Sequence, residues 1–290
     1  MSTPSDRSED LQSPLRYPGG KRFLCPYIEA IIRRNKLKPR LLVEPFAGGA
    51  SVALHLLGLG LVEKIALYDA DPMVVGLWQT VFHDGKWLRR KVRGAKITLD
   101  LWEQLKDAPL DGNRNNAWKC LFLNRTSFSG ILSQQAGPIG GKLQQSDYKI
   151  DCRFYRDTTI KRLKRLAAHK YLVEDIGVAT WQATLKKFAV NKGTEKSDTL
   201  IYLDPPFYHK ADRLYGHYFL SGQHEELIKR LAKSHQPWIL SYDNCTEIVS
   251  LFRKYGLRYR SVPVSYTSSV GCKRESKKEL VASNLSLPKA

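Results

Sequence analysis

The stretch Asp198–Phe207, with the sequence DTLIYLDPPF, constrains the fold of this 290-residue chain more than any other. Leu200–Leu203 is an apolar run with the length and the β-branched and aromatic content of a buried strand. The prolines that follow cannot donate to a sheet ladder, so the chain must leave the sheet directly after Asp204. In an open α/β sheet, ligands bind beyond the carboxyl ends of the strands. The stretch therefore predicts a carboxylate and an aromatic ring on a stiff turn at a binding site.

The groups on this turn suit the presentation of a flat aromatic amine. The exocyclic amine of adenine delocalises its lone pair into the ring and is a poor nucleophile. Asp204 and the carbonyl of Pro205 are expected to accept its two N–H groups, and Phe207 is expected to stack on the ring. The alternative is an ordinary strand-to-loop turn with a capping aspartate, which is the better interpretation of a bare D-P-P; the apolar strand and the aromatic residue make the two interpretations about equal.

The charge of the chain favours a polyanionic partner. Forty-seven lysines and arginines stand against 28 aspartates and glutamates, which gives a net charge of +19. This is far above the ~2–8 of a typical small domain and favours nucleic acid, bound by phosphate neutralisation and counterion release. A hydrophobic content of 42% is enough for a core and excludes a wholly disordered chain.

Cysteine and histidine placement predicts neither a metal site nor a disulfide framework. The five cysteines are odd in number and include no C-x-x-C, which is typical of reduced thiols in a cytoplasmic protein. No two of the seven histidines lie four residues apart. Residues 1–13 are polar, are expected to be disordered and contain no signal-peptide core. No apolar run reaches the ~20 residues that a membrane helix needs.

Two glycine turns early in the chain predict an anion site and a nucleoside cofactor site. Pro18-Gly19-Gly20 precedes Lys21 and a predicted helix over 23–34. A predicted strand over 40–43 ends in Glu44-Pro45-Phe46-Ala47-Gly48-Gly49, and a helix follows from Val52. Neither turn has Walker or G-x-G-x-x-G spacing, which disfavours a nicotinamide dehydrogenase.

An acidic residue follows the second turn at the spacing that suits ribose hydroxyls. A predicted strand over 64–68 ends at Asp69, about 20 residues after the turn. The alternative role is that of a helix N-cap, which we expect of one member of the pair Asp69 and Asp71.

The motifs R-Y-P-G-G-K, E-P-F-A-G-G-A, Y-D-A-D and D-P-P-F, in this order, resemble the Dam-like family of DNA adenine-N6 methyltransferases. The resemblance covers about residues 15–284. It implies an α/β fold, a Rossmann-like seven-stranded methyltransferase sheet with an inserted, mainly helical target-recognition domain. Residues 14–73 and 171–290 would form the catalytic domain that binds S-adenosylmethionine, and residues 74–170 the DNA target-recognition domain.

The resemblance also implies the reaction and its site. A methyl group would pass from S-adenosylmethionine, leaving S-adenosylhomocysteine, to N6 of adenine in double-stranded DNA, with base flipping and direct in-line transfer. The implied catalytic residues are Asp204, Pro205, Pro206 and Phe207, with Phe207 where relatives often have tyrosine. The implied cofactor-binding residues are Tyr17, Lys21, Glu44, Pro45, Phe46, Gly48, Gly49, Asp69 and Asp204. Tyr242, after a predicted strand over 238–241, matches a position beside the flipped base.

Several positions are expected to contact DNA. Phe128 and Ser129 would fill the space that a flipped adenine leaves. Two basic runs, over 86–93 and 153–165, are expected to contact phosphates, although a solvated helix face is the alternative for each. The remaining implied DNA-binding residues are Asn124, Arg125, Ser133, Gln134, Lys273 and Arg274.

Two details of these DNA-contacting positions follow from the resemblance. Asn124 and Arg125 either contact DNA or tie their loop to the catalytic domain. Relatives that read GATC carry an arginine where this chain has Ser133, so GATC reading is not expected.

Other functions fit part of this pattern. Transfer to N4 of cytosine, or to adenine in RNA, needs the same activation of an exocyclic amine. A DNA-binding module without catalysis is a further alternative, which the intact Asp204, Lys21 and Asp69 disfavour. The order of the motifs and the leading aspartate of D-P-P-F favour adenine in DNA.

Overall fold

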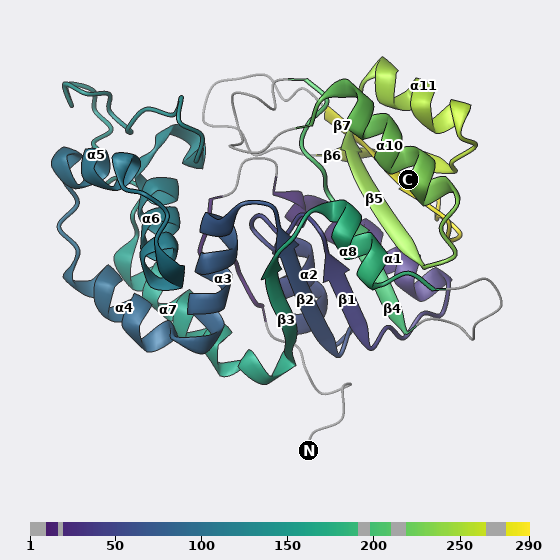
Figure 1. Ribbon diagram of the computed structural model, residues 1–290, viewed down its shortest axis with the longest axis horizontal. Helices are drawn as coiled ribbons and strands as arrows, with labels where there is room; N and C mark the ends of the chain where they lie inside the picture. The colour runs from purple at the N-terminus through teal and green to yellow at the C-terminus, as the bar shows by residue number, and fades with distance from the viewer. Residues whose placement is uncertain (1–9, 17–19, 191–197, 210–218, 265–276) are drawn as a thin grey trace.

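The computed structural model describes residues 10–16, 20–190, 198–209, 219–264 and 277–290 (Figure 1). These residues form a seven-stranded sheet of order β3-β2-β1-β4-β5-β7-β6. The first five strands of this order are parallel, and β7 runs antiparallel to both β5 and β6. The predicted α/β fold with a seven-stranded sheet is confirmed. The strands are β1 (Leu41–Glu44), β2 (Lys64–Asp69), β3 (Val173–Val178), β4 (Thr199–Leu203), β5 (Trp238–Asp243), β6 (Tyr259–Val264) and β7 (Lys277–Ser283).

Side chains of the central strands alternate between two apolar clusters, one on each face of the sheet. On β1, Leu42 belongs to one cluster, and Leu41 and Val43 belong to the other. This is the period of two that a pleated strand imposes, and it buries both faces of the parallel core. The first cluster takes in η2 (Lys21–Leu24), α1 (Cys25–Arg34) and α2 (Ser51–Gly58); the second takes in α8 (Trp181–Lys187), α10 (Ser221–Ala232) and α11 (Thr246–Lys254).

The central strands β1 and β4 lie at the point where the strand order reverses. From β1 the chain proceeds to β2 and β3 on one side, and from β4 to β5 on the other. The loops that leave the two strands therefore diverge and open a crevice beyond their carboxyl ends, which is where doubly wound sheets bind ligands. The Glu44–Gly49 turn and Asp204 both lie at this edge.

The segment between β2 and β3 is helical and shares the core of the sheet. Residues of α3, α6 and α7 belong to the same apolar cluster as those of α1 and α2. Gly76 of α3 allows α6 to approach closely, because a Cβ there would lie 2.7 Å from the Cβ of Asn116. Figure 1 shows this bundle at the β3 side of the sheet. Its elements are α3 (Pro72–His83), α4 (Gly85–Gly94), α5 (Leu99–Asp107), α6 (Gly112–Thr126), η3 (Phe128–Gly130), α7 (Arg156–Ala168) and η4 (Lys170–Leu172).

Two details differ from the sequence-based expectations. Residues 10–13 are not disordered: Leu11 is only 1% exposed and belongs to the main core cluster, so one leucine anchors an otherwise polar segment. The sequence YLVE at residues 171–174 predicts a core strand, but the strand begins at Val173, because residues 170–172 form a 3-10 turn. As the edge strand of the sheet, β3 is only partly buried, so its sequence carries a weak apolar signal.

The segment before the first glycine turn is tied to the end of α6. Asn124 accepts the backbone N–H of Arg16 at 2.7 Å and donates to the carbonyls of Arg16 and Gly130 at 3.3 and 2.8 Å. Gly130 has φ +74°, and a Cβ there would lie 2.2 Å from the carbonyl oxygen of Arg16. This contact requires glycine both for its backbone conformation and for its lack of a side chain.

No helix within the described ranges has the length and apolar character that crossing a membrane would require.

We predict that Gly130→Ala destabilises the protein strongly. The left-handed backbone alone costs about 1–2 kcal/mol for a residue with a Cβ, and the clash with Arg16 adds to this. Urea unfolding measures the effect. Gly137→Ala is the matched control in the same loop, since a Cβ there meets nothing within 4 Å and its φ is not positive. Equal unfolding free energies for the two variants would contradict the proposed close contact.

Candidate active site

Asp204 follows the last residue of β4 and pairs with a lysine from the first glycine turn. Lys21 Nζ lies 3.0 Å from Asp204 Oδ1, and the Lys21 side chain is 4% exposed. Ser241 Oγ, on the neighbouring strand β5, donates to the same Oδ1 at 2.9 Å. Among the described residues, both hydrogen bonds to the Asp204 carboxylate reach Oδ1, which leaves Oδ2 able to accept from a ligand.

Burial dominates the ionisation of Asp204. The exposed part of its side chain, 24%, faces a cavity. Loss of solvation raises its pKa above the usual range, while Lys21 and the Ser241 hydroxyl act in the opposite direction and Asp243 adds to the rise. The carboxylate is thus held close to protein charges and dipoles and has little contact with bulk water.

The rest of the D-P-P-F turn is held beside this pair. Lys21 Nζ lies 5.0 Å from the centre of the Phe207 ring, within cation–π range. The N–H of Tyr208 donates to Asp243 Oδ1 at 3.1 Å, which fixes the exit of the turn to the end of β5. Pro205 is buried, and Pro206 lines the cavity.

The second glycine turn is fixed from three sides. Glu44 is 3% exposed and accepts the N–H of Ala53, in the first turn of α2, at 2.7 Å. Asp69 Oδ2 accepts the N–H of Gly48 at 2.9 Å, and Trp78 Nε1 donates to the carbonyl of Gly48 at 2.9 Å. Burial raises the pKa of Glu44 well above its usual range, and nearby Asp204 and Asp69 add to the rise.

Asp71 is the helix cap of the Y-D-A-D motif. Its carboxylate accepts the N–H of Met73 at 2.8 Å in the first turn of α3. Asp69 Oδ1 accepts the N–H of Asp71 at 3.0 Å, so the two carboxylates have different tasks. The expectation that one of the pair caps a helix is confirmed for Asp71.

A cavity of about 230 Å³ joins these groups. It lies at the point where the strand order reverses, and most of the residues implied for cofactor binding and catalysis line it. These are Lys21, Glu44, Pro45, Phe46, Gly48, Gly49, Asp69, Asp204 and Pro206. Tyr17 lies outside the described residues.

The cavity wall also contains residues that sequence reasoning missed. Thr180, the N-cap of α8, and Trp181 follow the edge strand β3, and Phe219 precedes α10. Phe219 packs edge-on against Phe46 with ring centres 5.6 Å apart. Within the described part of the chain, the buried Nε1 of Trp181 has no hydrogen-bond partner. An aromatic wall with one unsatisfied donor suits a heteroaromatic ring that carries acceptor atoms.

The expected DNA-contacting residues fall into two groups. Phe128 is 67% exposed, and Ser129 and Gln134 are also exposed. Asn124, Arg125 and Ser133 are buried, with exposures of 0%, 3% and 4%. The hydrogen bonds of Asn124 are those of a structural tie, the second of its two expected roles. Lys273 and Arg274 lie outside the described residues.

The turn that carries Phe128 is braced at its base. Phe128 donates its N–H to Gly137 at 2.9 Å, and Ile139 donates to Thr126 at 2.8 Å. Lys106 Nζ donates to the carbonyls of Ser133 and Ala136. The exposed phenyl ring therefore projects from a fixed turn.

The expectation that Tyr242 lies beside a bound base is wrong. Tyr242 is 1% exposed, and its hydroxyl pairs with His224 Nδ1 at 2.7 Å. Its neighbours on β5, Ser241 and Asp243, point to the Asp204 side, so strand alternation turns Tyr242 the other way.

One group among the described residues brings three potential metal-ligand atoms together. The ligand atoms of His209, Cys245 and Glu247 all lie within 4.8 Å of one another. His209 pairs with Glu247 at 3.2 Å, and burial raises the pKa of the Cys245 thiol to about 11, which disfavours the thiolate that binds metals. The absence of a metal stays a prediction.

Comparison with known proteins identifies the family of this chain. The model of the family described as D12 class N6 adenine-specific DNA methyltransferase matches residues 17–265. Similar solved structures include precorrin-6y C5,15-methyltransferase from Geobacter metallireducens GS-15, with 12% identity over 88% of this chain and 85% of that one and a TM-score of 0.36. The methyltransferase domain of bacterial CtHen1-CN has 10% identity over 91% and 98% of the two chains and a TM-score of 0.39. A methyltransferase from Pyrococcus furiosus has 10% identity over 89% and 82%, with a TM-score of 0.33. A search of curated proteins gives no match.

We predict that Ser241→Ala raises the pKa of Asp204, because the lost hydroxyl favours the ionised form. NMR titration of the carboxyl carbon measures this. Ser283→Ala, a buried serine on β7 that donates to the carbonyl of Trp238, is the control and should leave the Asp204 titration unchanged.

The pKa of Asp204 also determines how its contribution to folding stability changes with pH. The folded-state pKa of Asp204 lies above its unfolded value, so its contribution to stability is greatest in acid and is lost as the pH rises through the folded pKa. An unchanged titration in Ser241→Ala would contradict the hydrogen bond to Oδ1.

Proposed function

Because this chain belongs to the D12 class of N6 adenine-specific DNA methyltransferases, we propose that its cavity binds S-adenosylmethionine and its D-P-P-F turn presents a flipped adenine. The reaction we propose is direct in-line transfer to N6 of adenine in double-stranded DNA, without a covalent enzyme intermediate. Residues 74–170 would supply most contacts to DNA, and residues 14–73 and 171–290 would bind the cofactor and perform the reaction.

The observation that carries the proposal is the geometry of Asp204. Lys21 and Ser241 both hold Oδ1, so Oδ2 is oriented by two contacts and is left to accept an N–H of the adenine amine. Accepting that hydrogen bond draws electron density back onto the amine nitrogen and aligns its lone pair. The Pro205 carbonyl would accept the second N–H, and Phe207, beside Lys21, would stack on the base. Positioning and fixed charges would supply most of the acceleration.

The charges around the cavity fit S-adenosylmethionine. Glu44, Asp69 and Asp204 all line it, in a protein whose net charge is +19. Their mutual repulsion contributes to the raised pKa of Glu44. A bound cation relieves this repulsion, and S-adenosylmethionine carries a sulfonium and an ammonium group. When bound, it supplies a methyl group that the sulfonium charge activates.

The remaining wall fits the uncharged parts of the same molecule. Asp69 lines the cavity, where its carboxylate also fixes Gly48 and Asp71, and it would accept hydrogen bonds from the ribose hydroxyls. Phe46, Trp181 and Phe219 would enclose the adenine of the cofactor, with Trp181 Nε1 as a donor to a ring nitrogen. Lys21 would help to place the carboxylate end.

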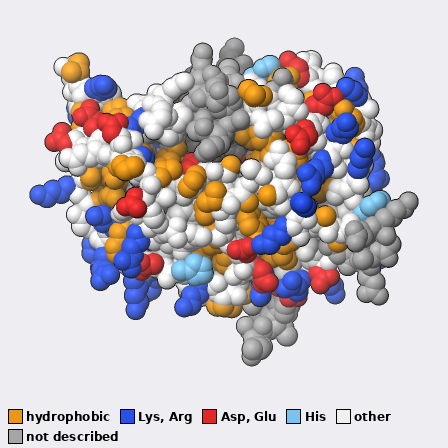
Figure 2. Space-filling model, in the orientation of Figure 1, with side chains coloured by type: hydrophobic (Ala, Val, Ile, Leu, Met, Phe, Trp, Pro, Cys, Tyr) orange, Lys and Arg blue, Asp and Glu red, His pale blue; other side chains and the backbone are white. Residues whose placement is uncertain are grey.

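Two surfaces support DNA as the substrate. Phe128 projects from a braced turn, and we propose that it enters the space left by the flipped base. Lysines and arginines gather over α4 and α7 (Figure 2), where a phosphate backbone would be neutralised. The exposed members of this basic face are Lys86, Arg90, Lys91, Arg93, Lys161, Lys164 and Arg165. Lys273 and Arg274 would add contacts from the segment between β6 and β7.

We predict that expression in a methylation-free host places N6-methyladenine in one short DNA motif, read by single-base sequencing of modified bases. Asp204→Ala should lower turnover at least about a hundredfold, because the amine loses its acceptor. Binding of S-adenosylmethionine, measured by calorimetry, should persist in part. Asp198→Ala, at an exposed position directly before β4, is the control and should keep full activity.

Other results of this experiment would change the proposed substrate or the proposed role of Asp204. N4-methylcytosine would change the target base, and methylated RNA with unmodified DNA would change the polymer. Full activity of Asp204→Ala would exclude the proposed role of its carboxylate.

We predict that Phe128→Ala reduces base flipping. A duplex with 2-aminopurine at the target position becomes fluorescent when that base leaves the stack, and the increase should fall severalfold in the variant. Tyr171→Ala removes another exposed aromatic side chain, 63% exposed in η4, and should leave the signal unchanged. Equal signals from the two variants would contradict the insertion of Phe128.

A further inference from the structure

A second cavity, of about 280 Å³, lies beside the cofactor cavity. Its walls come from the segment 10–16, from the first glycine turn with η2, from the second glycine turn with the start of α2, and from α7. It shares Gly20, Gly49 and Ser51 with the first cavity. The other lining residues are Gln12, Ser13, Leu15, Arg16, Arg22 and Arg162.

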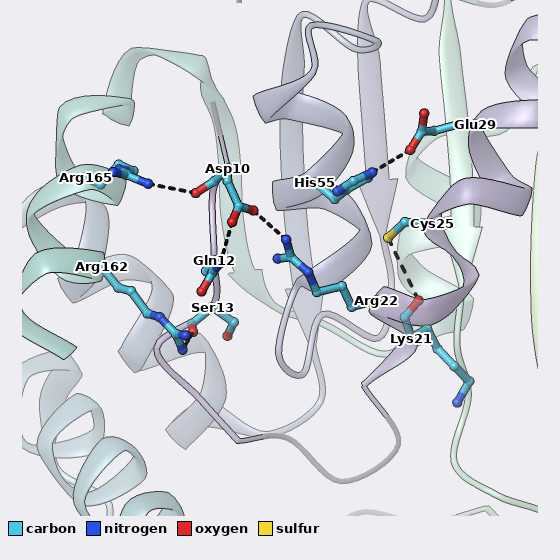
Figure 3. Close-up of polar contacts among 10 residues, drawn as sticks. All are labelled: Asp10, Gln12, Ser13, Lys21, Arg22, Cys25, Glu29, His55, Arg162 and Arg165. Carbon is cyan, nitrogen blue, oxygen red and sulfur yellow. Dashed lines mark hydrogen bonds and ion pairs between the residues drawn. The ribbon is translucent and has the colours of Figure 1, made fainter. Parts of the chain in front are cut away.

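Three arginines in this lining come from three different elements. Arg162 of α7 donates to the carbonyl of Ser13 at 2.9 Å, and Arg22 of η2 pairs with Asp10 at 2.5 Å. Figure 3 shows both side chains extending from opposite sides toward the segment that crosses between them. The Arg22 side chain is 47% exposed, so the cavity opens to solvent on that side.

Some guanidinium nitrogens of this region have no hydrogen-bond partner among the described residues. One is Nη1 of Arg16, which is buried. The same holds for Nε and Nη2 of Arg125, which is 3% exposed and whose Nη1 donates to the carbonyl of Arg153 at 3.5 Å. Buried cationic donors without partners are costly, and native proteins fill such places with an anion or water.

The arginines also repel one another. Burial, together with Arg162 and Arg16, lowers the pKa of Arg125 to about 10. Burial and Arg153 lower the pKa of Arg16, and burial and Arg22 lower that of Arg162. Asp10, the carboxylate paired with Arg22, is half exposed at the rim, with a side-chain exposure of 51%. The cavity therefore concentrates positive charge that Asp10 compensates only in part.

We propose that this second cavity binds a phosphate group between Arg16, Arg22 and Arg162. Guanidinium forks match phosphate oxygens in pairs, and three forks from separate elements can surround a tetrahedral anion. The phosphate comes either from the DNA backbone or from a free phosphate compound, since both present the same oxygens. Bound phosphate would join the segment 10–16 to α7 and to the turn that holds Lys21.

Calorimetric titration of the full-length chain with inorganic phosphate at low ionic strength tests the site, without S-adenosylmethionine and independently of methyl transfer. Arg162→Gln should raise the dissociation constant for phosphate about tenfold or more, since it removes charged hydrogen bonds. Lys229→Gln, which removes an exposed charge on α10 outside the basic face, is the control and should bind as the unmodified chain does.

Ser13→Asp is a second variant, which tests the site even if Arg162→Gln does not fold. Its carboxylate can still accept the N–H of Leu15 as Ser13 Oγ does at 3.3 Å, and it places a negative charge in the cavity. It should also abolish phosphate binding, with an unchanged midpoint of thermal unfolding.

Duplex binding at several salt concentrations identifies the source of the phosphate. If the DNA backbone occupies the cavity, Arg162→Gln weakens duplex binding and reduces the slope of log K against log salt by about 0.9, the value for one phosphate. If a free phosphate compound occupies the cavity, inorganic phosphate binds, and the duplex affinity of Arg162→Gln equals that of Lys229→Gln.

Two results would overturn the proposal. One is phosphate binding that is equal in Arg162→Gln, Ser13→Asp and Lys229→Gln, which would place the anion elsewhere. The other is no phosphate binding by the unmodified chain, combined with identical duplex binding of Arg162→Gln and Lys229→Gln.

Discussion

The ion pair between Lys21 and Asp204 is the contact on which the rest of this site depends. Lys21 is 4% exposed, and a buried ammonium group is stable only with a partner. The pair fixes the first glycine turn, near the start of the chain, against the end of β4. It also determines which oxygen of Asp204 is engaged and which is left for a ligand. Each of the two side chains orients the other, so the geometry of the site requires both.

The central reversal of strand order explains why the charged residues gather where they do. β1, β2 and β4 all end at one edge, and each ends in or directly before a carboxylate: Glu44, Asp69 and Asp204. Parallel strands present their carboxyl ends together, so the topology itself concentrates negative charge in the crevice. Burial raises the pKa values of Glu44 and Asp204 in this setting. A protein with an excess of positive charge thus keeps an acidic interior site beneath a basic exterior, which suits a cationic cofactor and a polyanionic substrate.

Sequence reasoning identifies the parts of this site that local chemistry specifies. The prolines after Asp204 force the chain out of the sheet, and the glycine turns are visible as short motifs, so these positions follow from residue types alone. Ser241 and Trp181 were missed because each depends on strand pairing: β5 must lie beside β4 before Ser241 can reach Asp204. Tyr242 was misplaced because a strand turns alternate side chains to opposite faces, and the register was unknown. Leu11 could not be distinguished from a tail residue without its partners in the core.

The helices between β2 and β3 share one core with the sheet, and this limits how independently the two can move. α6 packs on α3 at Gly76, and both contribute to the apolar cluster that also contains α1 and α2. At the end of α6, Asn124 hydrogen-bonds to the backbone N–H and carbonyl of Arg16, and Gly130 packs closely against that carbonyl. That backbone leads within a few residues to Lys21, and Lys21 holds Asp204. The turn that carries Phe128 is therefore connected to the carboxylate of Asp204 by close-packed backbone and by one buried ion pair. Such a connection favours a rigid platform on which a substrate is positioned, because a shift at either end would require breaking a buried hydrogen bond or separating buried charges.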